Sequence, residues 1–229
     1  MKPTVLLFDI DGTLVTMGGV GRRAFDRAFE RLHGRRDACA LLRFDGSTDR
    51  ATTRLALEGI GAEATEVAID QLLSAYLPEL EAELASASPE AFRVYPGVLA
   101  VLQAARASGA AVGLGTGNIE AGARRKLEYF DLYRHFDFGG FGDDHELRPE
   151  LIRRGAERGA AKLGQALAAC RVVIIGDTPK DIDAARAIGA ESIGVGTAGY
   201  TAEQLLAHGA TFAFPDLTAA GLLSALLGN

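Results

Sequence analysis

Short apolar runs alternate with amphipathic stretches over most of this chain. The clearest runs cover residues 4–8 and residues 172–175. A strand that is buried on both faces of a parallel sheet reads as such a run, because neither face meets water. Apolar residues at helical spacing between the runs predict that helices connect the strands. The pattern therefore predicts an α/β protein, a Rossmann-like parallel sheet core with helices on both faces.

The other predicted elements of this core follow the same alternation. Further strands are expected at residues 110–114, 136–141, 192–195 and 211–214. Helices are expected at residues 98–107, 120–130, 149–163, 181–188, 201–208 and 218–227.

A helical block follows the first strand and interrupts the alternation. Apolar side chains recur at helical spacing in residues 21–33, 48–58 and 64–84. Pro78 falls inside the last stretch and is expected to kink or split it. No strand is expected from about residue 16 to 90.

This block divides the predicted fold into two parts. We expect a core formed by residues 1–15 and 92–229, and an all-helical cap domain formed by residues 16–91. The glycines of residues 18–21 are expected to act as a hinge where the two parts join. Such an insert would sit over the carboxyl ends of the strands.

Composition and charge limit the classes of function. The chain has 229 residues, of which 48% are hydrophobic, and two cysteines, which do not form a disulfide framework. Its net charge of −6 disfavours nucleic acid and anionic membranes as partners. Neither a signal peptide nor an apolar run of about 18 residues is evident. We expect a cytoplasmic protein, a monomer or homodimer.

The first apolar run ends in two carboxylates, Asp9 and Asp11. Open α/β sheets bind their ligands at the carboxyl ends of the strands. Alternation along an extended chain turns Asp9 and Asp11 towards the same side. Aspartate, glycine and threonine also favour turns, so a plain strand-to-turn junction is the alternative.

The string DIDGTL at residues 9–14 resembles the first motif of the haloacid dehalogenase superfamily, in its phosphatase branch. Asp9 is the candidate nucleophile, because an aspartate that attacks phosphorus forms an aspartyl-phosphate. Asp11 is the candidate general acid and base for the leaving alcohol and for water. The resemblance implies the same roles. The members that cleave carbon–halogen bonds lack the second aspartate, so Asp11 favours a phosphate ester.

The second core strand is followed by Thr116, Gly117 and Asn118. A threonine hydroxyl and the backbone N–H groups after it can hold a phosphoryl oxygen where the chain enters a helix. The position resembles the second motif of the superfamily. An ordinary loop with Asn118 as helix N-cap is the alternative.

The third motif departs from the family, which places a lysine here, often before a proline. Arg148 precedes Pro149 at the matching place, and a residue before proline avoids helical geometry, so we expect Arg148 in the loop. Arginine can grip phosphate with two parallel hydrogen bonds. The alternatives are a solvated Arg148 and, as the basic residue, Lys126, which is expected on the surface of its helix.

The strand at residues 172–176 runs into Asp177, and Asp181 follows four residues later. This string resembles the fourth motif of the superfamily. Magnesium prefers oxygen ligands, and Asp177 with Asp9 can supply carboxylates. The resemblance implies the backbone carbonyl of Asp11 as a third Mg²⁺ ligand, and Asp181 as a residue that steadies a bound water or the basic residue. Helix capping by the two acids is the alternative.

The predicted cap holds candidates for recognition of the leaving group. Residues 46–49 (GSTD) resemble a cap segment of phosphoglycolate-phosphatase-like members, and a helix start with Ser47 or Thr48 as N-cap is the alternative. Four arginines of the cap are candidates to meet a second anionic group of a substrate: Arg22, Arg23, Arg43 and Arg50.

These motifs predict a Mg²⁺-dependent phosphatase that hydrolyses a small phosphorylated metabolite through an aspartyl-phosphate. The nearest branch is phosphoglycolate-phosphatase-like. A phosphomutase of the β-phosphoglucomutase type shares the expected fold and intermediate, and it would be identified by a dependence on a sugar bisphosphate. A catalytically inert binding protein on the same fold is the other alternative, and the presence of Asp9, Asp11 and Asp177 argues against it.

Overall fold

The computed structural model describes residues 2–228. Its centre is a six-stranded sheet with the order β5-β4-β1-β6-β7-β8, in which every pairing is parallel. In the central strand, Leu7 pairs with Gly113 on one side and with Ile174 on the other. The strands are β1 Thr4–Phe8, β4 Ala111–Gly115, β5 Gly139–Gly140, β6 Arg171–Gly176, β7 Glu191–Val195 and β8 Phe212–Phe214.

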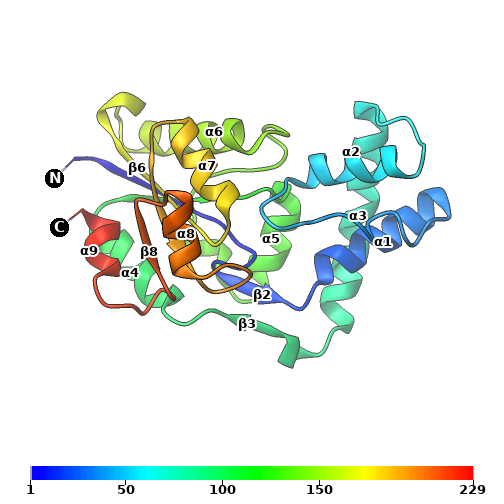
Figure 1. Ribbon diagram of the computed structural model, residues 1–229, viewed down its shortest axis with the longest axis horizontal. Coiled ribbons are helices and arrows are strands. Elements are labelled where there is room, and N and C mark those ends of the chain that lie inside the picture. The colour runs from blue at the N-terminus through cyan, green and yellow to red at the C-terminus, as the bar shows by residue number, and fades with distance from the viewer. Residues whose placement is uncertain (1, 229) are drawn as a thin grey trace.

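Helices cover both faces of the sheet (Figure 1). Along β1, Leu6 and Phe8 pack into one hydrophobic cluster, and Val5 and Leu7 pack into another on the opposite face. The first cluster includes helices α4, α5 and α9, and the second includes α6 and α7. The predicted doubly covered parallel sheet is therefore confirmed. The helices of this part are α4 Val98–Ala107, α5 Glu120–Glu128, α6 Arg148–Lys162, α7 Pro179–Ala187, α8 Ala202–His208 and α9 Leu222–Leu227.

Three helices lie between β2 (Val15–Met17) and β3 (Phe92–Val94), and we call them the cap helices. They are α1 Val20–His33, α2 Asp49–Gly59 and α3 Glu66–Ser86. Phe25 of α1 stacks on Tyr76 of α3 with ring centroids 4.2 Å apart. Figure 1 shows the cap helices at the end of the molecule opposite the chain termini.

One expectation about this segment is wrong, and one of the two alternatives given for Pro78 is excluded. Val15–Met17 forms a strand, β2, which pairs antiparallel with β3, Phe92–Val94. A three-residue strand is too short to show alternation, and its partner lies far away in the sequence. Pro78 does not split the helix, since α3 runs unbroken through it to Ser86.

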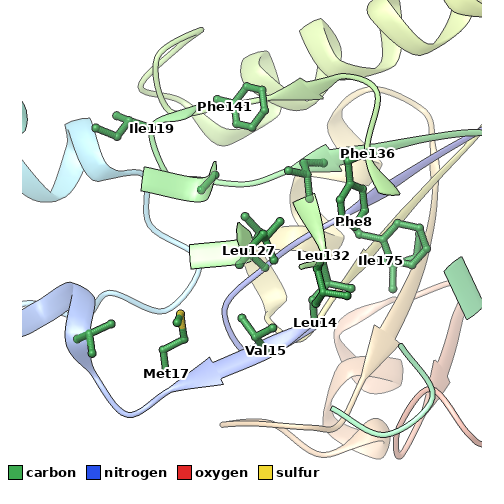
Figure 2. Packing of buried hydrophobic residues seen from close by; sticks show 14 of the residues in the cluster. Phe8, Leu14, Val15, Met17, Ile119, Leu127, Leu132, Phe136, Phe141 and Ile175 are labelled. Carbon is green, nitrogen blue, oxygen red and sulfur yellow. The ribbon is translucent and has the colours of Figure 1, made fainter. Parts of the chain in front are cut away.

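The antiparallel pair of β2 and β3 connects the cap helices to the sheet, because the chain enters the cap helices after β2 and returns to the sheet after β3. Figure 2 shows Leu14, Val15 and Met17 continuing the buried layer that begins with Phe8 and Ile175 under the strand ends. Phe8 also meets Phe136 edge-on, with ring centroids 6.3 Å apart. Within residues 2–228, no helix is both long enough and apolar enough to cross a membrane.

Candidate active site

Asp9 and Asp11 lie where β1 ends, and both line one cavity of about 350 Å³ between the sheet and the cap helices. The backbone N–H of Asp9 donates to the carbonyl of Ile175 at 2.9 Å, which extends the ladder with β6 by one residue. The Asp9 side chain is buried, whereas that of Asp11 is 46% exposed. The two acids thus face the same space with different access to water.

Asp177 and Asp181 come close to Asp9 from the neighbouring strand β6 and helix α7. One carboxylate oxygen from each of the three lies within 4.8 Å of the others. The chain at Gly12 passes so near that a Cβ there would collide with the Asp177 carboxylate, and Gly12 also has φ +87°. Glycine is therefore required at this position, both for the backbone conformation and for the close approach.

Arg148 is the cation of this cluster. Its Nη2 lies 3.2 Å from Asp9 Oδ1 and 2.5 Å from Asp181 Oδ1, and its side chain is 6% exposed. Helix α6 begins at Arg148 itself, so the expectation of a loop residue is wrong by one position, and so is the alternative of a solvated arginine. Among the described residues, no acceptor reaches the buried Nε of Arg148.

Lys126 was expected on the surface of its helix, and the structure contradicts this. Its side chain is 6% exposed, and its Nζ donates to Asp11 Oδ2 and to Asn118 Oδ1, each at 2.7 Å. The buried face of α5 contains Gly122, Ala123 and Leu127, and Lys126 lies on that same face. The two basic candidates therefore contact different aspartates: Arg148 contacts Asp9, and Lys126 contacts Asp11.

Thr116 and Asn118 lie directly after β4 and line the cavity. The amide Nδ2 of Asn118 donates to the hydroxyl of Thr116 at 2.8 Å and to Asp11 Oδ2 at 2.9 Å. Asn118 makes no side-chain cap on α5, so that alternative is wrong. Its amide instead links the second motif to the second aspartate.

Asp49, at the start of α2, lines the cavity, and the sequence pointed to it only as part of the segment 46–49. Its carboxylate accepts from the backbone N–H of Ile119 at 2.9 Å, and its own N–H donates to the carbonyl of Gly117 at 2.8 Å. Burial raises the pKa of Asp49 to about 7, although Lys126 acts to lower it. Thr48 is the N-cap of α2, as the alternative for this segment predicted. An acid in the first turn after that cap was the available signal.

The segment before α2, and α2 itself, contact the loop before α6 and the first turn of α7. The Thr48 hydroxyl donates to the carbonyl of Glu146 at 2.8 Å, and Lys180 Nζ donates to the Ser47 hydroxyl at 2.8 Å. Arg54 donates to the Glu146 carboxylate at 2.8–2.9 Å. The cap helices therefore stand in a docked position over the strand ends.

Comparison with known proteins agrees with this geometry. A family model described as haloacid dehalogenase-like hydrolase matches residues 3–189. The chain belongs to this family. The phosphoglycolate phosphatase of Rhodospirillum rubrum is 29% identical over 231 residues, which cover 96% of this chain and 90% of that protein. Family and relative together confirm the predicted enzyme class, a phosphatase.

Solved structures share the fold of this phosphatase. CbbY from Rhodobacter sphaeroides, in complex with phosphate, has a TM-score of 0.71 at 19% identity, covering 96% of this chain and 97% of that one. A hydrolase from Pseudomonas syringae has a TM-score of 0.68 at 21% identity, covering 97% of this chain and 96% of that one.

The acid cluster of the phosphatase carries more negative charge than its own residues compensate. Burial raises the pKa of Asp9 to about 6, against the lowering effect of Arg148. Burial also raises the pKa of Asp177 to about 8, and Asp181 and Asp9 add to the rise. Three carboxylates thus share one guanidinium, while the Asp177 side chain accepts, among residues 2–228, only from the Thr13 hydroxyl, at 3.1 Å. An all-oxygen, anionic set of this kind fits a hard divalent cation such as Mg²⁺.

The arginines expected to meet a second anionic group are mostly engaged elsewhere. Arg22 donates to the carbonyls of Cys39 and Leu42 at 2.6 Å each. Arg23 pairs with Glu83, and Arg50 pairs with Glu66 and Asp70. Of the four, Arg22 alone lines the cavity, and Arg43 is exposed.

Proposed function

We propose that this phosphatase hydrolyses a small phosphomonoester with the help of Mg²⁺ and through an aspartyl-phosphate on Asp9. The observation that carries the proposal is the meeting of Asp9, Arg148 and Asp177 at the carboxyl ends of β1 and β6, at the wall of one cavity. A nucleophile, a fixed cation and an anionic metal pocket are the parts that phosphoryl transfer requires.

In the first step, a carboxylate oxygen of Asp9 attacks phosphorus, and the bond from phosphorus to the ester oxygen breaks. Asp11 donates a proton to that oxygen, so the product leaves as an alcohol. In the second step, Asp11 takes a proton from water, whose oxygen attacks the phosphorus of the aspartyl-phosphate. Inorganic phosphate is released and Asp9 is regenerated.

Arg148, Thr116 and Gly117 are proposed to hold the phosphoryl oxygens. The buried Nε of Arg148 lacks an acceptor among residues 2–228, and a phosphoryl oxygen would provide one. Asp181 holds Arg148 in place, which supports its proposed role as a positioning residue. The side chain of Asn118 contacts Thr116 and Asp11, so it is proposed to align these two groups.

Asp9, Asp177 and the backbone carbonyl of Asp11 are the proposed Mg²⁺ ligands. The bound cation would neutralise charge on the phosphoryl group and on the carboxylates. The raised pKa values of Asp9 and Asp177 support this assignment, because they show that ionising both acids is unfavourable without an added cation.

The substrate is proposed to be phosphoglycolate or a similarly small phosphorylated metabolite. The name of the Rhodospirillum rubrum relative and the cavity of about 350 Å³ support a small leaving group. Residues 16–91 are proposed to act as a cap domain on a core of residues 1–15 and 92–229. A cytoplasmic monomer or homodimer without nucleic-acid or membrane partners is proposed, in keeping with the net charge of −6.

The test is phosphate release from a panel of phosphomonoesters by the wild type, Asp9→Asn and Asp183→Asn. Asp183 is an exposed acid of α7 and serves as the matched control. We expect activity in the wild type and the control, and none in Asp9→Asn or in EDTA. Equal activity in Asp9→Asn would refute the nucleophile. Isomerisation of a sugar monophosphate that requires a sugar bisphosphate and releases no net phosphate would favour the phosphomutase.

A further inference from the structure

Within residues 2–228, three cationic side chains line the cavity, and each has different contacts. Arg148 contacts Asp9 and Asp181 at the nucleophile. Arg22 donates to two carbonyls of its own layer and lies over the Phe44 ring, 4.3 Å from its centroid. Lys126 contacts Asp11, the proposed proton donor. The charge nearest to the leaving group is therefore that of Lys126.

The ammonium group of Lys126 still has donor capacity. An ammonium carries three N–H donors, and Asp11 and Asn118 occupy two of them. Within residues 2–228, no third acceptor lies within hydrogen-bond distance of Nζ. A substrate group that reaches the neighbourhood of Asp11 would meet a cation with one donor to spare, almost wholly removed from water.

The first turn of α1 adds to the positive character of this place. A Cβ added to Gly21 would lie 3.5 Å from Lys126 Nζ and 3.8 Å from the Tyr76 hydroxyl, so the backbone of this turn passes close by. The N-cap residue of this helix is Gly19, which offers no side-chain cap, and the first turn contains no acid. Its first N–H groups are therefore left for another acceptor.

We propose that Lys126 determines specificity by binding a carboxylate on the carbon that bears the ester oxygen. The inference rests on the proposed function, in which Asp11 protonates that oxygen. Lys126 Nζ lies 2.7 Å from Asp11, so an anionic group one carbon beyond the ester oxygen falls within its reach. The buried Phe25 and Tyr76 rings line the same cavity and leave room for a short leaving group.

The experiment compares two esters of equal length, 2-phosphoglycolate and 2-hydroxyethyl phosphate. The first carries a carboxylate where the second carries a neutral CH₂OH group. The readout is the ratio of their kcat/KM values. Any effect of Lys126 on the orientation of Asp11 is shared by both esters and cancels in this ratio. One charge-assisted hydrogen bond predicts a wild-type ratio of about tenfold or more in favour of phosphoglycolate.

The variants are Lys126→Met, Lys126→Arg and Arg125→Met. Arg125 precedes Lys126 on α5 but pairs with Glu81 outside the cavity, so its removal controls for lost charge on the same helix. We expect the ratio to fall to about one in Lys126→Met, to survive in Lys126→Arg, and to stay at the wild-type value in Arg125→Met. If Lys126→Met does not fold, Lys126→Gln keeps an amide donor for Asp11 and tests the same loss of charge.

The outcomes separate this inference from the proposed function. A wild-type ratio near one, or a high ratio that the neutral variants retain, would overturn the role of Lys126 while leaving the phosphatase mechanism in place. A wild type that hydrolyses neither ester would overturn the proposed substrate class and the inference together. A ratio that falls equally in Arg125→Met would also count against Lys126, because it would indicate a general effect of charge.

Discussion

Nη2 of Arg148 lies 3.2 Å from Oδ1 of Asp9, and both side chains are almost fully buried. The family pattern has lysine at the matching position of the sequence. Burial alone would lower the pKa of Arg148, but Asp181 and Asp9 outweigh it and raise that pKa, so the guanidinium stays charged. Asp9, the proposed nucleophile, is therefore held beside a permanent cation whose planar fork can face carboxylate and phosphate together.

Replacement of Arg148 should damage both stability and activity. Arg148→Met leaves Asp181 and Asp9 as unpaired buried carboxylates, and the free energy of unfolding should fall by about 3–5 kcal/mol. Arg148→Lys keeps a charge but loses the fork, so it should retain more stability and less than a tenth of the wild-type kcat/KM. Urea unfolding and phosphate release measure the two effects. If Arg148→Met unfolds like the wild type, the pair with Asp181 does not stabilise the fold.

Gly12→Ala should disable the proposed Mg²⁺ site. An added Cβ would collide with the Asp177 carboxylate, and φ at Gly12 is +87°. We expect Mg²⁺ affinity to fall at least about tenfold, measured by calorimetry, together with phosphate release. Gly34→Ala is the matched control, since Gly34 has φ +65° with nothing within 4 Å of the added Cβ. Equal Mg²⁺ affinity in the two variants would show that Asp177 is free to move and is not a ligand.

The sequence predicted the core of the site because its signals are local. An apolar run that ends in Asp9 places the acid at the carboxyl end of a strand, and parallel pairing then brings Asp177 beside it. Unbroken apolar runs located β1 and β6 well, since both strands are buried on two faces. The outer strand was predicted at residues 136–141, but only Gly139–Gly140 pairs with the sheet. The length of an edge strand depends on its pairing with its single neighbour, here β4, which the local sequence does not show.

Features that depend on distant partners escaped prediction. Lys126 lies on the buried face of α5. A lysine is normally expected to be exposed to solvent unless a buried partner is known, and here that partner is Asp11. Asp49 gains its role from Ile119, which is 70 residues away in the sequence. The strand β2 forms by pairing with β3, which follows the cap helices in the sequence. In each case the missing information was a non-local contact.

The metal-free phosphatase should lose stability as the pH rises. The pKa of Asp9 is raised to about 6 and that of Asp177 to about 8, so between about pH 4 and pH 8 the folded state binds protons that the unfolded state has released. The free energy of unfolding then falls with increasing pH across this window. Mg²⁺ would oppose this loss by compensating the carboxylates.

Thermal unfolding with EDTA and with excess Mg²⁺ checks the expectation. The Tm in EDTA should decrease from about pH 5 to pH 8, and the increase in Tm caused by Mg²⁺ should grow over the same range. Asp177→Asn should flatten the pH dependence in EDTA, because it removes the group with the higher pKa. A Tm in EDTA that rises with pH would contradict the assigned direction of both pKa values.

Docking of the cap helices should depend on the absence of a side chain at residue 117. A Cβ added to Gly117 would collide with the backbone carbonyl of Ser47, while the Gly117 carbonyl accepts from the N–H of Asp49 at 2.8 Å. Both neighbours are backbone groups, so Gly117→Ala cannot be accommodated by a rotamer change. It must push the segment before α2 away from the strand ends.

We expect Gly117→Ala to fold, because the displaced segment lies at a boundary between layers, but to lose about 10²-fold in kcat/KM, since displacements of about 1 Å at a closed site cost this much. Gly59→Ala, at the end of α2, is the control, because nothing lies within 4 Å of its added Cβ. Wild-type activity in Gly117→Ala would mean that the docked position is not the reactive one. Loss of activity in Gly117→Ala alone would tie catalysis to the contact between Ser47 and the loop after β4.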